Sequence, residues 1–226
     1  MYTSFYQWQG REFVCLCGEG RGATPSDQAR ELLQRFDGEL RETGLSIENT
    51  VRTRLWARDR ESRTEGSAER VKGLSGKARS VSSSYIAPGH FDSDANIALD
   101  LIAMRPAASD SNKHLKEYDP PIVPLRYLTY GPLAFLSGVT AEVGTLAEQV
   151  ADILPRIEAS LLDAGSSWAQ AVQVSFFLHR GEDPDEFKRL FRETVSADVP
   201  AMDHSFVDGY SSPGKLVEIE VTGLRT

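Results

Sequence analysis

The sequence contains few of the residues that form disulfides or hold metal ions. Among its 226 residues are only two cysteines, Cys15 and Cys17, and four histidines. A disulfide between residues two apart on a strand would be badly strained, so we expect two free thiols in a reducing compartment. The single C-x-C spacing and the scattered histidines match no structural metal site, and we expect neither a metal nor an organic cofactor.

Long apolar runs and an excess of positive charge are also missing. No stretch approaches the length that crosses a bilayer, and residues 1–10 have neither a basic start nor an apolar core, so we expect no signal peptide and a cytoplasmic protein. Lys and Arg number 25 against 33 Asp and Glu, a formal net charge of −8. Such an acidic chain has no general attraction for phosphate backbones or anionic membranes. We therefore expect no nucleic-acid or membrane partner, although 52–63 is locally basic.

The sequence repeats itself once. Two segments have apolar residues at helical spacing and end in glycine, and two others alternate as strands do. An offset of 121 residues relates 27–44 to 148–165 and 51–59 to 172–180. Five elements match in the same order, which predicts two units with the element order β-β-α-β-α-β-β.

Each unit should be α+β, a mixed β-sheet with two helices on one face. The polar, proline-bounded segment 106–121 is typical of a linker. It divides the chain into a first unit, 1–105, and a second unit, 122–226.

Both units resemble the RidA family, also called the YjgF or reactive-intermediate deaminase family. In the second unit the resemblance rests on "LAFLSGVTA", on 148–178, and on "PAMDHSFV" and "KLVEIEV". In the first unit it rests on "CLCG", "KARSV" and "IALDLIA". The resemblance implies a chorismate-mutase-like fold for each unit and trimers with ligand clefts between neighbouring sheets. For a tandem chain it implies a homotrimer with six units.

The resemblance also assigns residues of unit one to a site. Arg79, in "KARS", stands where the family binds the carboxylate of a small imine or enamine acid, and Ser80 follows it. Tyr6 is the best match to a tyrosine that closes the pocket. Cys17 and Gly18 stand at a serine–glycine pair that lines the cleft.

Either unit two complements unit one, or each unit has lost part of the site. It has Ser137 and Gly138 at the serine–glycine pair, and Glu218 at a glutamate of the last strand that helps to place the hydrolytic water. Unit one has Ala98 at that glutamate position, with Asp100 two residues on. Unit two in turn has Met202 in place of the arginine. We expect Arg79 and Glu218 to be catalytic, and the substrate-binding residues to be Tyr6, Cys17, Gly18, Ser80 and Asp100.

The residues alone leave alternatives open. Arg79 could be an exposed arginine in an ion pair, and the serines that follow it could be the solvated side of an edge strand. Cys17 has no histidine nearby in the sequence to activate it, which favours a small buried strand residue. Glu218 and Glu220, two residues apart on one strand face, could simply be solvated.

The resemblance favours a hydrolase that deaminates a small imine or enamine acid, with the carboxylate held by Arg79. Two other functions stay open. One is a non-catalytic ligand-binding or partner protein of a specialised metabolite pathway. The other keeps the fold but changes the reaction to C–C or C–O cleavage, as the remotely similar chorismate-cleaving enzymes suggest.

Overall fold

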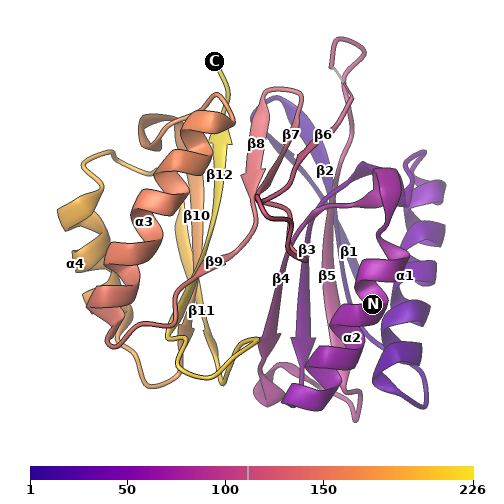
Figure 1. Cartoon of the computed structure of the whole chain (residues 1–226). Helices are drawn as coiled ribbons and strands as arrows, with labels where there is room; N and C mark the ends of the chain where they lie inside the picture. The colour runs from indigo at the N-terminus through magenta and orange to yellow at the C-terminus, as the bar shows by residue number, and fades with distance from the viewer. Residues whose placement is uncertain (111) are drawn as a thin grey trace.

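The computed structural model describes residues 1–110 and 112–226. It contains two β-sheets that face each other, each covered on its outer side by two helices (Figure 1). The chain therefore forms four layers, helices–sheet–sheet–helices, and the inner faces of the two sheets meet in the middle of the molecule.

Unit one supplies five strands and two helices. They are β1 (Tyr2–Trp8), β2 (Arg11–Glu19), α1 (Pro25–Glu42), β3 (Thr50–Ala57), α2 (Arg60–Gly73), β4 (Val81–Ile86) and β5 (Ile97–Met104). Unit two and the segment before it supply β6 (His114–Lys116), β7 (Tyr127–Tyr130), β8 (Leu133–Leu136), β9 (Val139–Thr140), α3 (Leu146–Asp163), β10 (Ala171–His179), α4 (Pro184–Thr194), β11 (Met202–Val207) and β12 (Val217–Leu224). Short 3₁₀ turns lie at Ile47–Asn49, Gly76–Ala78, Pro88–His90 and Trp168–Gln170.

The strand orders confirm the predicted repeat. The first sheet runs β1-β2-β5-β3-β4, and the second runs β11-β10-β12-β8-β7-β6, with β9 also paired to β12. Read from the opposite edge, the second sheet repeats the first. The additional strand β6 lies inside 106–121, the segment expected to be a linker, and pairs with β7.

The two long helices begin at capping residues that the sequence repeats. The side chain of Thr24 accepts a hydrogen bond from the Asp27 amide, and Pro25 opens α1. In α3, Thr145 and Glu148 form a reciprocal capping box. Both helices therefore start two residues before the predicted starts at 27 and 148. After each helix the chain turns at a glycine with positive φ, Gly44 after α1 and Gly165 after α3.

The strands alternate between an apolar and a polar face. In β3, Leu55 and Ala57 pack beneath the helices, while Arg52 and Arg54 point toward the other sheet. In β12, Val217, Ile219 and Val221 pack beneath α3 and α4. The intervening residues of β12 point toward unit one. The layer between the sheets therefore contains charged and polar side chains beside apolar clusters, and its polar part positions the site.

One edge of the first sheet is joined to unit two by backbone hydrogen bonds. Ile86, at the end of β4, donates its amide to the Gly209 carbonyl at 2.8 Å and accepts from the Asp208 amide at 2.7 Å. This bridge fixes the distance between the two sheets at one corner. On one side of this bridge, β4 and α2 of unit one face β9 and β12 of unit two across an open space, described next.

Candidate functional site between the two units

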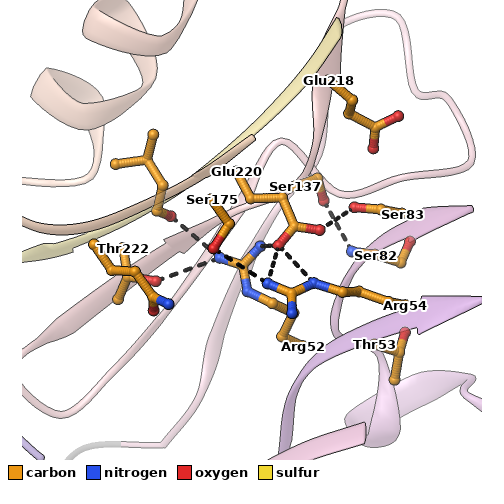
Figure 2. A network of polar contacts seen from close by, with 12 residues as sticks. Arg52, Thr53, Arg54, Ser82, Ser83, Ser137, Ser175, Glu218, Glu220 and Thr222 are labelled. Atoms are coloured by element: carbon orange, nitrogen blue, oxygen red, sulfur yellow. Dashed lines mark hydrogen bonds and ion pairs between the residues drawn. The ribbon is translucent and has the colours of Figure 1, made fainter. Parts of the chain in front are cut away.

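A buried ion cluster joins the sheets (Figure 2). Arg52 and Arg54, from β3, each approach Glu220 Oε2 of β12 with a guanidinium nitrogen at 2.7 Å. Ser83, on β4, donates its hydroxyl to Glu220 Oε1. Glu220 and Arg52 are almost fully buried. Two cations and a hydroxyl thus hold this carboxylate in its ionised form.

Glu218 lies two residues before Glu220 and faces an open space instead of the cluster (Figure 2). It is also buried, yet it makes no ion pair within the described residues. The Tyr85 hydroxyl lies 3.4 Å from Glu218 Oε1 and from Glu220 Oε1, so it connects the two carboxyl groups. A Cβ atom at Gly138 would overlap the Glu218 carboxyl. Glycine at 138 therefore leaves the room that this carboxyl occupies.

The two carboxyl groups have opposite pKa shifts. Burial, and next the nearby charge of Glu220, raises the pKa of Glu218 to about 7. Burial alone would also raise the pKa of Glu220, but the charges of Arg52 and Arg54 outweigh it and lower that pKa to about 2. At neutral pH the site therefore contains one permanent carboxylate and one carboxyl group that can give or take a proton. Such a divergent pair is typical of acid–base sites.

Glu218 opens into a cavity of about 650 Å³ between the units. Its walls come from α2 and β4 of unit one and from the ends of β8, β9 and β12 in unit two. Lining residues include Arg63, Arg70, Ser82, Gly138, Lys215 and Glu218. The volume suits a small organic molecule, and the lining places cations beside a titratable acid.

A second cavity of about 570 Å³ adjoins the first and contains Arg79 and Ser80. The two cavities share Arg70, Val71, Ser82 and Val123. The structure thus places Arg79 of unit one and Glu218 of unit two on adjoining cavities that share Arg70.

The guanidinium group of Arg79 is paired with a carboxylate of the chain itself. Its two terminal nitrogens contact the two oxygens of Glu117, the second pair at 3.1 Å. Glu117 follows β6, and both side chains remain about one-third exposed, at 32% and 38%. Arg79 thus accommodates a carboxylate in bidentate geometry, the geometry in which a guanidinium also binds small acids.

The remaining predicted substrate-binding residues lie elsewhere. Cys17, Gly18 and Asp100 line a separate cavity, together with Ala98 and His90. Asp100 accepts a hydrogen bond from Trp56 Nε1 at 2.8 Å. The structure therefore does not bring these residues together with Arg79 and Glu218.

Tyr6 lies on the edge strand β1, stacked on Phe13 with 5.2 Å between ring centroids. It borders neither of the cavities that hold Arg79 and Glu218. The aromatic neighbours of β1 explain this position: Tyr6 covers Phe13, whose ring belongs to the core between the sheets.

Cys15 and Cys17 are free thiols, half-buried on the inner face of β2, with their sulfurs 3.8 Å apart. The hydrogen bond from Cys15 and burial raise the pKa of Cys17 above its ordinary value. A thiol held in its protonated form is a poor nucleophile. This environment favours Cys17 as a strand residue that lines its cavity, not as a reactive group.

The strand register corrects one expected counterpart. Arg54 pairs with Ser83, and the repeat-related Ser175 pairs with Asp203, so Ser83 corresponds to Asp203. Counting back four residues makes Val199 the counterpart of Arg79. Met202, expected at that place, instead corresponds to Ser82. The correction arises because the loop before β11 is three residues shorter in register than the alignment of "KARS" with "PAMD" assumed.

Arg52, Arg54 and Arg70 were not among the residues expected in the site, and 52–63 was expected only to be locally basic. The sequence does contain a signal. β3 carries arginine at two alternating positions, on either side of Thr53, and β12 carries glutamate at two alternating positions between apolar residues. Alternating charges of opposite sign on two otherwise apolar strands indicate faces that meet. Glu117 has no comparable signal.

None of the helices in the described ranges is long and apolar enough to cross a membrane. Nor do residues 1–110 and 112–226 gather three or more His, Cys, Asp or Glu side chains at a place that could hold a metal ion.

No protein-family model matches the chain, and no curated protein matches it in sequence. A chorismatase structure matches 98% of this chain and 77% of its own, with a TM-score of 0.69 and 16% identity.

YjgF-family structures match about half of the chain. One is a member of the YjgF/YER057c/UK114 family from Mycobacterium tuberculosis, 24% identical over 50% of this chain and 98% of that one, with a TM-score of 0.45. Another, from Neisseria meningitidis, is 27% identical over 50% of this chain and 95% of that one, with a TM-score of 0.44.

The fold follows from the repeated strand order and from the whole-chain match, which spans both units. The chain therefore has a tandem α+β fold, with one repeated unit in each half, and shares this fold with the chorismatase structure.

Proposed function

We propose that the protein hydrolyses a small unsaturated acid at the cleft between its units, and that an imine or enamine acid is the substrate class. The observation that carries this proposal is Glu218, a buried carboxyl with a pKa of about 7 at the edge of a cavity. A group with this pKa can both donate a proton and accept one near neutral pH.

The reaction needs both transfers. In an enamine acid, the protonated Glu218 gives its proton to the alkene carbon and leaves an iminium ion. The Glu218 carboxylate then accepts a proton from water as the water oxygen bonds to the iminium carbon. Proton transfer to nitrogen and loss of ammonia give a keto acid, so enamine plus water becomes keto acid plus ammonia. An imine acid enters at the water step.

Arg79 holds the substrate carboxylate in this proposal. The guanidinium already accommodates one carboxylate, that of Glu117, in bidentate geometry. The substrate acid takes the place of Glu117, which is partly exposed and can turn toward solvent. Glu220 stays ionised beside the reacting group, and its charge favours both the proton on Glu218 and the cationic intermediate.

A second reaction is supported by the whole-chain likeness to a chorismatase. Cleavage of an enol ether uses the same first step: a carboxylic acid protonates the alkene carbon, and water adds to the oxocarbenium ion that forms. An alcohol then leaves in place of ammonia. The same Glu218 and Arg79 would serve this C–O cleavage.

Assay of both substrate classes tests the proposal. Enamine and imine acids generated in situ from amino acids by an amino-acid oxidase, and a stable enol-ether acid, would be incubated with the protein and with its Glu218→Gln variant. Release of keto acid that depends on Glu218 supports hydrolysis, and the preferred substrate decides between C–N and C–O cleavage. Binding of these acids without turnover would make the protein a ligand-binding protein instead.

We also propose a homotrimer, on the family resemblance. The edge strand β1 exposes Tyr2, Phe5 and Tyr6, which offers apolar surface for a neighbouring chain. Light scattering at micromolar concentration tests this, and a monomer there would refute it.

A further inference from the structure

Two arginines face the site without a carboxylate partner. Arg70 is almost fully buried, with 4% of its surface exposed, and Arg63 is half-buried on the same helix, α2. Both line the cavity that contains Glu218, and Arg70 also lines the cavity that contains Arg79. Arg70 therefore places positive charge where the two cavities adjoin, and Arg63 places positive charge in the cavity that contains Glu218.

The hydrogen bonds of both arginines go to neutral oxygens. Arg70 donates to the Ser83 carbonyl at 2.6 Å and to the Ser84 hydroxyl at 2.9 Å. Arg63 donates to the Ser84 carbonyl at 3.2 Å. Within the described residues, neither has a carboxylate oxygen within the 4 Å of an ion pair, and Glu218 across the cavity does not reach them.

The other arginines that face the space between the units differ. Arg52 and Arg54 share Glu220, and Arg79 has Glu117. A buried cation without a counter-ion is costly, since desolvation is not repaid by attraction. The cost is visible at Arg70, where burial, and next the charge of Arg63, lowers the guanidinium pKa to about 10. An anion in the cavity would offset this cost of burying the Arg70 charge.

We infer that Arg63 and Arg70 bind a second anionic group of the ligand, so that the protein takes dicarboxylic acids in preference to monocarboxylic ones. This inference rests on the proposed function for the first carboxylate, which Arg79 holds. The second carboxylate contacts Arg70, which lines both cavities, and Arg63, which lines the cavity that contains Glu218. The site thereby selects an acid with charges at both ends.

The shape of the combined cavity agrees with such a ligand. The shared wall contains the aliphatic side chains of Val71 and Val123, which suit a short hydrocarbon or unsaturated spacer. Glu218 lies in the same cavity as Arg63 and Arg70. A dicarboxylic acid whose second carboxylate meets Arg63 and Arg70 would therefore extend into the cavity that the titratable carboxyl lines.

Calorimetric titration with unreactive acids tests the inference on the full chain. Succinate and glutarate would be compared with butyrate and valerate, which match them in length but carry one carboxylate. We expect the dicarboxylates to bind at least ten-fold more tightly. Arg63→Gln and Arg70→Gln should remove most of that preference and leave monocarboxylate binding nearly unchanged. Arg41→Gln is the control, because Arg41 is an exposed arginine on α1 paired only with Asp37.

The outcomes separate this inference from the proposed function. Equal affinity for both acid classes, or a preference that survives both substitutions, would overturn the second anion site. Carboxylate binding by Arg79→Ala and turnover of the parent protein test the proposed function. Neither result tests the second anion site at Arg63. If Arg70→Gln does not fold, Arg63→Gln decides, because Arg63 is partly exposed and carries one backbone hydrogen bond.

Discussion

The internal repeat gives the molecule two equivalent clefts, and their chemistry differs. In the first cleft, β4 of unit one meets β12 of unit two, with Arg79 and Glu218 on adjoining cavities. In the second cleft the backbone is repeated, but the positions equivalent to Arg79 and Glu218 carry the uncharged residues Val199 and Ala98.

The difference extends to the residues behind the site. Both arginines of the ion cluster come from unit one, and their counterparts in unit two are Gln173 and Ser175. Glu220 therefore has two cations opposite it, whereas its counterpart Asp100 accepts from the neutral indole of Trp56. In the first cleft Glu218 is buried beside the fixed negative charge of Glu220, and burial first and that charge second raise the pKa of Glu218.

The strongest test of the comparison is Glu218→Gln. Loss of the titratable group should lower kcat by about 10²- to 10⁴-fold and leave ligand binding almost intact, since only proton transfer is lost. Activity of the parent protein should fall as pH rises through about 7, because the protonated acid is consumed there. Asp203→Asn, in the second cleft, is the control. Full activity and an unchanged pH profile in Glu218→Gln would show that another group carries the proton transfer.

Glu220→Gln should cost the most stability. Removing the shared carboxylate leaves Arg52 and Arg54 buried without a partner, so the free energy of unfolding should fall by about 3–5 kcal/mol. Urea unfolding at neutral pH measures this. Asp208→Asn, which breaks the exposed pair with Arg180, should cost less than about 1 kcal/mol. Similar losses in both variants would show that the cluster is no stronger than a surface pair.

Glu220 also predicts how stability changes with pH. Its pKa is lower in the folded protein, about 2, than in the unfolded chain. Its contribution is therefore complete above the unfolded pKa near 4.5 and is lost as pH falls toward 2. Glu218 has the opposite sign: its folded pKa is raised, so its contribution is complete below about 4.5 and is lost as pH rises through about 7.

Arg79→Ala should weaken carboxylate binding and turnover by about thirty- to a thousand-fold, the effect of roughly 2 to 4 kcal/mol for a charged bidentate contact. Arg79→Lys should recover only part of this, because an ammonium keeps the charge but loses the planar fork. Val199→Ala, at the equivalent position of unit two, should leave turnover unchanged. Equal losses at both positions would mean that Arg79 supports the fold and not the ligand.

Much of this architecture could be predicted from the sequence, for a physical reason. Helices 27–44 and 148–165 and strands 51–59 and 172–180 are fixed by local periodicity, which the repeat presents twice. The ion cluster was harder to foresee, because Arg54 and Glu220 are 166 residues apart and meet only when the sheets stack. The separation of Cys17 and Asp100 from Arg79 also depends on which cleft each strand borders, and spacing along the chain does not encode that.

The contact of Glu117 with Arg79 could not be predicted from the sequence, since Glu117 belongs to a segment with no counterpart in the repeat. Substitution of Glu117 should have the smallest effect of the changes proposed. Glu117→Gln removes the carboxylate that competes for Arg79, so small acids should bind about two- to five-fold more tightly, as expected for the loss of a partly exposed ion pair. Glu12→Gln is a matched control, because Glu12 pairs with Arg105 at similar exposure, far from the site. Titration with butyrate measures both. Weaker binding in Glu117→Gln would mean that Glu117 orients Arg79 for the ligand instead of standing in its place.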